Sequence, residues 1–93
     1  MSGTELLRAF DGAIAAARRL EAEGQVNVVE LRRLLDELAA RRADVAAGRG
    51  LDGEWAGRTV RSVAAWLPDG ELPLLARLGN IVRVAGSDDT RRP

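Results

Sequence analysis

Hydrophobic residues along this chain recur every three or four positions, in four runs separated by glycine or proline. This spacing is typical of amphipathic helices that bury one face. It predicts helices over residues 4–23, 28–47, 54–67 and 71–85, all within one domain of residues 1–85. The predicted fold class is therefore all-α, a small four-helix bundle. The polar residues 86–93 are expected to form a disordered tail.

The second run is the most regular of the four. Asn27 and Glu30 have the spacing of a capping box, which marks the start of a helix. The apolar residues that follow lie on a seven-residue repeat: Val28, Leu31, Leu35, Leu38 and Val45. About three heptads are at the lower limit for a coiled coil. We therefore expect this helix to be the central element of the bundle, covered by the other three.

Two arginines interrupt the apolar repeat of the second helix. Arg42 occupies the position of the next apolar residue, and Arg41 lies beside it. Both could extend along the apolar surface and pair locally, Arg41 with Glu37 and with Asp44. Alternatively, they could provide a recognition charge at a subunit interface, where one polar group sets the register. The sequence leaves both interpretations open.

The first helix has two features on its surface. A line of small residues lets a neighbouring helix approach closely, and tight packing inside the chain is favoured over a dimer interface as its explanation. This line comprises Ala9, Gly12, Ala13 and Ala16. The larger apolar face beside it comprises Leu6, Leu7, Phe10, Ala13, Ile14, Ala17 and Leu20.

The third helix contains both tryptophans of the chain. Asp52 is its expected N-cap. Trp55 and Trp66 are eleven residues apart, so they lie about 20° apart around the helix axis and share a side. Either both belong to the core, or one lies at an interface with a partner, where tryptophan is enriched.

The fourth helix follows a strong turn, in which Pro68 ends the preceding helix and Asp69-Gly70 reverses the chain. Opposite its apolar side it carries Arg77, Asn80 and Arg83 at three-residue spacing. These side chains form either a solvated face or a contact for an anion or an acidic partner.

Composition excludes several classes of function. Fourteen acidic residues balance fourteen basic ones, so no net charge steers the chain toward nucleic acid or anionic lipid. Histidine and cysteine are absent, which removes the commonest general base and the thiolate. The glycines of residues 48–53 lack the Gly-Lys-Ser/Thr ending of a phosphate-binding loop. We expect no enzyme activity, cofactor, metal site or small-molecule substrate.

Location and source are also indicated by the sequence. No window has the length and hydrophobicity of a membrane-spanning helix, and the N-terminal residues do not resemble a signal peptide. A cytoplasmic location is therefore expected. All cations are arginine and alanine is abundant, which indicates a GC-rich coding source and a bacterial origin.

These observations favour a non-catalytic protein-protein interaction or adaptor module, which could bind a protein partner or a second copy of itself as a homodimer. The alternative is a nucleic-acid-binding regulator that uses the third and fourth helices as a helix-turn-helix, although Pro68 and Trp66 crowd the turn. The predicted partner-binding residues are Trp55, Trp66, Arg77, Asn80 and Arg83.

Overall fold

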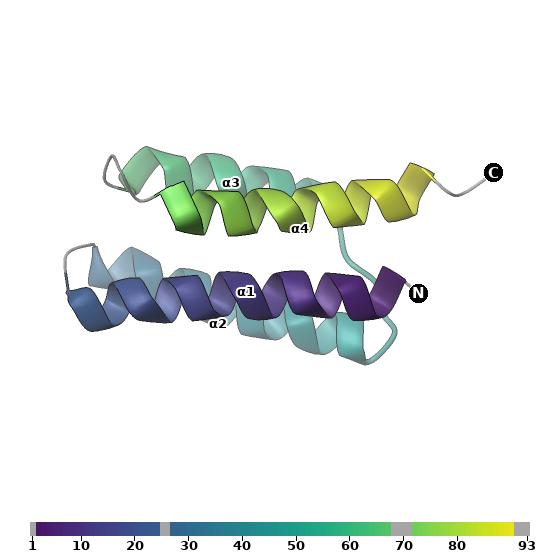
Figure 1. Cartoon of the computed structure of the whole chain (residues 1–93), viewed down its shortest axis with the longest axis horizontal. Helices are drawn as coiled ribbons and strands as arrows, with labels where there is room; N and C mark the ends of the chain where they lie inside the picture. The colour runs from purple at the N-terminus through teal and green to yellow at the C-terminus, as the bar shows by residue number, and fades with distance from the viewer. Residues whose placement is uncertain (1, 25–26, 68–71, 91–93) are drawn as a thin grey trace.

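The protein folds as an all-α four-helix bundle, as the hydrophobic pattern predicts (Figure 1). The computed structural model describes residues 2–24, 27–67 and 72–90, and no strand occurs among them. The predicted turn at Pro68 to Gly70 lies outside this described part. The helices are α1 (Ser2–Glu23), α2 (Val28–Ala46), α3 (Gly53–Trp66) and α4 (Leu72–Thr90).

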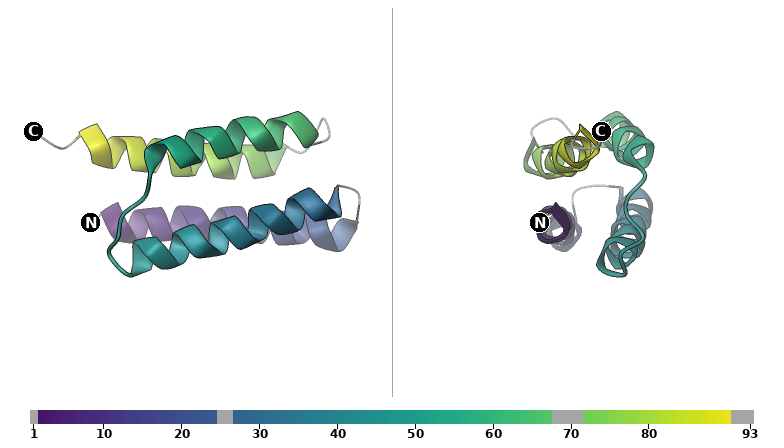
Figure 2. Two further views of the ribbon diagram at one scale, coloured as in Figure 1. Left: turned by 180° about the vertical axis from the view of Figure 1, so that it is seen from behind. Right: turned by 90° about the vertical axis from the view of Figure 1, so that its right-hand side faces the viewer.

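The four helices form two layers, α1 with α2 and α3 with α4 (Figure 2). Helix α1 packs against both α2 and α4, and α3 packs against α4. Among the four pairs of neighbouring helices, α2 and α3 have the least close backbones, and the segment between these helices crosses this side of the bundle. The bundle is therefore closed along three of its four edges and more open along the α2–α3 edge.

Local signals at the helix ends agree with the structure. Asn27 is the N-cap of α2, and its side chain accepts a hydrogen bond from the Glu30 backbone N–H at 3.3 Å. Asp52 likewise caps α3 by accepting from the Glu54 backbone N–H at 3.0 Å. Gly24 follows α1 with a φ of 68°, a left-handed conformation that glycine adopts without steric cost. The predicted starts of α2 and α3 and the predicted stop of α1 are confirmed.

The prediction that the second helix is the central element is wrong. Helices α1 and α4 each pack against two neighbouring helices, whereas α2 packs closely against α1 alone. Among the described side chains, helix α1 also buries the largest number of core residues, which are Leu6, Ala9, Phe10, Ala13, Ala17 and Leu20. Only Leu31, Leu34 and Leu38 of α2 are buried. Alanine has a small side chain, so the alanine-rich side of α1 can pack closely against other helices.

The seven-residue repeat of α2 also differs from its buried face. Leu34 is buried although it lies off the repeat, whereas Val28 is 39% exposed. Leu35 and Val45 are half-buried. Leu31 and Leu38 of the repeat are buried together with Leu34, so the buried face of α2 is shifted from the Leu35 side of the repeat toward Leu34.

Helix α4 is longer than predicted. It continues to Thr90, five residues past the expected end at Ala85. Glycine at position 86 weakens a helix without ending it as proline would, and the next proline is Pro93. Disorder of the C-terminal tail stays a prediction, and residues 91–93 lie outside the described part of the chain.

Candidate interaction surface

Trp55 is a core residue that anchors α3 to the other layer of the bundle. Its side chain is 8% exposed and stacks on the fully buried Phe10 of α1, with ring centroids 6.0 Å apart and an interplanar angle of 20°. Aromatic pairs at this separation add to the stabilisation from burial. The structure thus places Trp55 in the core.

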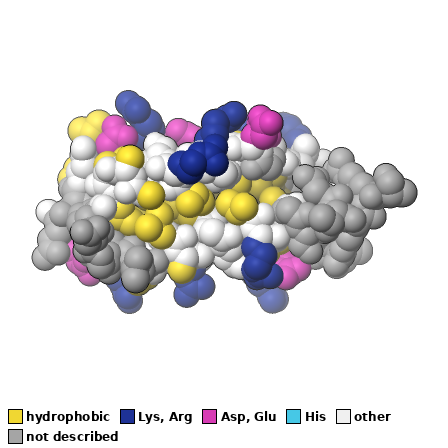
Figure 3. All heavy atoms as spheres, turned by 90° about the horizontal axis from the view of Figure 1, so that it is seen from above, with side chains coloured by type: hydrophobic (Ala, Val, Ile, Leu, Met, Phe, Trp, Pro, Cys, Tyr) yellow, Lys and Arg dark blue, Asp and Glu magenta, His cyan; other side chains and the backbone are white. Residues whose placement is uncertain are grey.

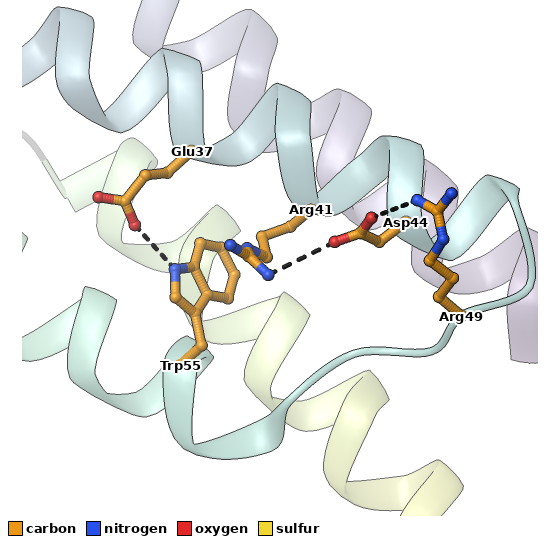
Figure 4. Close-up of polar contacts among 5 residues, drawn as sticks. All are labelled: Glu37, Arg41, Asp44, Arg49 and Trp55. Carbon is orange, nitrogen blue, oxygen red and sulfur yellow. Dashed lines mark hydrogen bonds and ion pairs between the residues drawn. The ribbon is translucent and has the colours of Figure 1, made fainter.

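The indole N–H of Trp55 joins α3 to α2. It donates a hydrogen bond of 2.8 Å to the Glu37 carboxylate (Figure 4). The guanidinium of Arg41 lies 5.9 Å from the Trp55 ring centroid, within range for a cation–π contact. Trp55 therefore has a polar contact at its nitrogen and a cation near its ring.

The predicted pairing of Arg41 is confirmed for one of its two partners. Arg41 pairs with Asp44 at 3.4 Å, and Asp44 also accepts from Arg49 at 2.8 Å (Figure 4). No ion pair joins Arg41 to Glu37 in the described part of the chain, which corrects that prediction. Glu37 accepts the Trp55 indole N–H instead, because α3 brings this donor to α2.

Arg42 connects α2 to α1. Its Nε donates to Asp11 Oδ1 at 2.6 Å, and a second guanidinium nitrogen lies 3.4 Å from Asp11 Oδ2. The hydrogen bond to Asp11, and then the charge of this carboxylate, raise the pKa of the Arg42 guanidinium above its ordinary value. The charge within the apolar repeat thus has a partner inside the same chain.

A groove with a volume of about 250 Å³ runs along the open edge between α2 and α3. Trp66 is half-buried and lines it together with Trp55, so the two tryptophans share a side as predicted. Trp66 differs from Trp55 in keeping more of its side chain accessible. The other lining residues are Glu30, Arg33, Leu34, Glu37, Arg58, Thr59, Ser62 and Val63.

Charges of both signs surround the groove. Arg33 lies 3.8 Å from Glu30 on α2, and Arg58 lies 3.8 Å from Glu54 on α3. Most of these side chains are exposed, so the pairs contribute little to stability. The groove therefore combines an apolar base with a charged rim of both signs.

Arg77, Asn80 and Arg83 do not form a single patch. The Arg77 side chain lies against Gly12 of α1, and its Cδ would be 3.4 Å from a Cβ at that position. The close contact of α1 with α4 therefore explains the line of small residues on α1 as packing inside the chain. Farther along α4, Arg83 donates a hydrogen bond to the Asn80 side chain. Arg77 thus borders α1, whereas Asn80 and Arg83 interact with each other.

Arg77 also lines a depression of about 510 Å³ between α1 and α4. Arg19 and Glu23 of α1 line it as well, so it carries both signs of charge. Among the described residues, no cluster of three acidic side chains is arranged to hold a metal ion. In the same part of the chain, every helix is too short or too polar to cross a lipid bilayer.

Comparison with known proteins identifies no relative. No protein-family model, curated protein or solved structure matches this chain at a significant level. Function must therefore be inferred from the surfaces of the bundle.

Proposed function

We propose that this protein is a small, non-catalytic interaction module that binds a protein segment in the groove between α2 and α3. The observation that carries this proposal is the half-buried Trp66 on the edge where helix packing is weakest. Tryptophan is among the residues that contribute most to binding energy at protein interfaces. A partner that covers Trp66 would complete the burial that the bundle leaves unfinished.

The size of the groove supports a protein partner. Its volume of about 250 Å³ is below the roughly 300–1,000 Å³ of sites for drug-sized ligands. It suits one or two large side chains of a partner. Its charged rim resembles the polar rim that surrounds the apolar centre of many protein interfaces.

The residues of the groove have different roles in this proposal. Trp66 and Ser62 contact the partner, and Trp55 positions α3 through Phe10 and Glu37. The interaction and adaptor role, the absence of enzyme activity, the bacterial origin and the cytoplasmic location stay predictions.

The partner is either a different protein or a second copy of this chain. Sedimentation equilibrium at micromolar concentration measures the solution mass and decides between a monomer and a homodimer. If the chain is a dimer that uses the groove, the Ser62→Arg substitution is expected to shift it toward monomer, because the added side chain fills the groove. A dimer that is unaffected by this substitution would use another surface.

Site-specific photo-crosslinking in the source cells tests the proposal with no need to choose a candidate partner. A photoreactive amino acid at Ser62 samples the groove, and one at Ala39 samples another exposed flank of α2. The expected result is a defined protein adduct from position 62 that is missing from position 39 and is lost in the Trp66→Ala variant. The same adducts from both positions, or none from position 62, would contradict the proposal.

A further inference from the structure

The outer face of the α3–α4 layer carries a line of hydrophobic side chains that is distinct from the groove (Figure 3). Val60 and Leu67 are seven residues apart on α3, and Leu75 and Val82 are seven residues apart on α4, so each pair lies on one side of its helix. Val60, Leu67 and Leu75 are half-buried, and Val82 is 36% exposed. We call these four residues the seam.

Contacts on the other flanks of both helices place the seam between α3 and α4. On α3, the flank of Trp55, Thr59 and Trp66 faces α2. On α4, the flank of Leu74 and Arg77 faces α1. Since α3 and α4 pack against each other, the opposite flanks meet along the seam.

The backbone beside the seam is accessible to another helix. A Cβ added at Gly79 would meet no atom within 4 Å, and one at Gly57 would meet only the Arg61 guanidinium, at 3.8 Å. Both glycines are half-buried, and Ala64 next to the seam is exposed. Small residues of this kind let a second helix approach closely and contact the apolar side chains.

The described charged side chains beside the seam are basic. By helical position, Arg61 of α3 and Arg83 of α4 lie on the two outer sides of the seam. Among the described side chains of these helices, the cations are Arg58, Arg61, Arg77 and Arg83, and Glu54 is the single acid. Glu54 pairs with Arg58, and within the described residues neither Arg61 nor Arg83 has an acidic partner.

We propose that the seam binds an amphipathic helix of a protein partner, with aliphatic side chains along Val60, Leu67, Leu75 and Val82 and flanking carboxylates that pair with Arg61 and Arg83. We favour this partner over a second copy of the seam, because a symmetric contact would bring Arg61 and Arg83 of both copies together. Nucleic acid would leave the apolar line without a partner, since phosphate contacts use the charges alone.

Two designed helical peptides with the same leucine face test the charge preference. One has glutamate on both flanks of the leucines and the other has lysine. NMR titration of the full chain is expected to show binding of the glutamate peptide, with amide shifts concentrated at residues 57–67 and 75–83. The lysine peptide should bind at least tenfold more weakly. Equal binding of both peptides, or shifts elsewhere in the bundle, would overturn the proposal.

Charge reversal provides a second test with a matched control. The Arg61→Glu, Arg83→Glu double variant is expected to lose about tenfold in affinity for the glutamate peptide and to prefer the lysine peptide, because two attractive charge contacts become repulsive. The Arg8→Glu, Arg18→Glu double variant changes two exposed charges on α1 and should keep the wild-type preference. An unchanged preference in the seam variant contradicts the proposal.

The apolar contribution is tested at Val82. Val82→Glu is expected to abolish binding of the glutamate peptide, whereas Val29→Glu, at a 68% exposed position on α2, should have no effect. Duplex DNA and vesicles with anionic lipid are titrated in parallel. Shifts at the seam that appear with DNA or vesicles and not with the glutamate peptide would overturn the proposal in favour of those ligands.

Discussion

The indole N–H of Trp55 donates to the carboxylate of Glu37 at 2.8 Å, across the edge where α2 and α3 pack least closely. This bond joins the two layers beside the candidate groove. It also fixes the Trp55 ring, which stacks on Phe10. The position of α3 relative to α2 should therefore depend on this pair.

Loss of the acceptor should destabilise the bundle. Glu37→Ala is expected to lower the free energy of unfolding by about 1–2 kcal/mol, because hydrogen bonds to charged groups contribute roughly 1.5–3 kcal/mol and water in the groove replaces part of the bond. Glu37→Gln keeps an acceptor and should lose less than half as much. Urea denaturation measures both variants. Equal losses would show that the hydrogen bond to Trp55 is not the cause.

The two tryptophans should differ in their contribution to stability. Trp55→Ala is expected to lower the free energy of unfolding by about 3–5 kcal/mol, as is typical for truncation of a buried aromatic residue. Trp66→Ala should lose about half of that, because Trp66 is only half-buried in the groove. Thermal and urea unfolding of both variants provide the comparison. A larger loss of stability in Trp66→Ala than in Trp55→Ala would contradict the assignment of Trp55 to the core and Trp66 to the groove.

The close contact of α1 with α4 at Gly12 leaves room for one methyl group. A Cβ added at Gly12 would lie 3.4 Å from Arg77 Cδ, which is an ordinary van der Waals distance to a flexible side chain. Gly12→Ala is therefore expected to raise the free energy of unfolding by about 0.5–1 kcal/mol through helix propensity. Gly12→Leu should instead destabilise the bundle, because it displaces Arg77. Stabilisation by leucine would contradict close packing at this position.

Stability should be constant between about pH 6 and pH 8. The chain has no histidine or cysteine, the side chains whose ordinary pKa values lie closest to this range. The hydrogen bond to Asp11 raises the pKa of Arg42. The stabilisation from this hydrogen bond is complete below the pKa of arginine in the unfolded chain. It is lost only as the pH rises through the raised pKa of Arg42 in the folded chain. Urea denaturation measures the free energy of unfolding across this range. A change of more than about 0.5 kcal/mol in this free energy would contradict the prediction.

The sequence predicts the four helices because periodicity and caps are local properties. Asn27 and Asp52 illustrate this, since each needs only the residues that follow it. The buried face of α2 is less predictable, because the adjacent Leu34 and Leu35 both fit a three- and four-residue spacing with Leu31 and Leu38, and packing against α1 decides that Leu34 is buried.

Contacts between helices depend on how each helix is rotated and shifted against its neighbour. The bond from Trp55 to Glu37 and the pair of Arg42 with Asp11 both depend on this geometry, so spacing along the chain does not encode them. The spacing of Trp55 and Trp66 predicts their shared side. It does not predict that one lies in the core while the other stays half-buried in the groove.

Titration calorimetry with the protein that is crosslinked through position 62 measures directly whether the groove is the binding surface. Trp66→Ala is expected to weaken binding at least tenfold, as for a residue that dominates an interface. Ser62→Arg fills the groove without changing the core, because Ser62 is exposed. It should also weaken binding, and it tests the groove independently of any effect of Trp66→Ala on folding. Val29→Ala, outside the groove, should stay within about twofold of wild type. Wild-type affinity in both groove variants would contradict the proposed function.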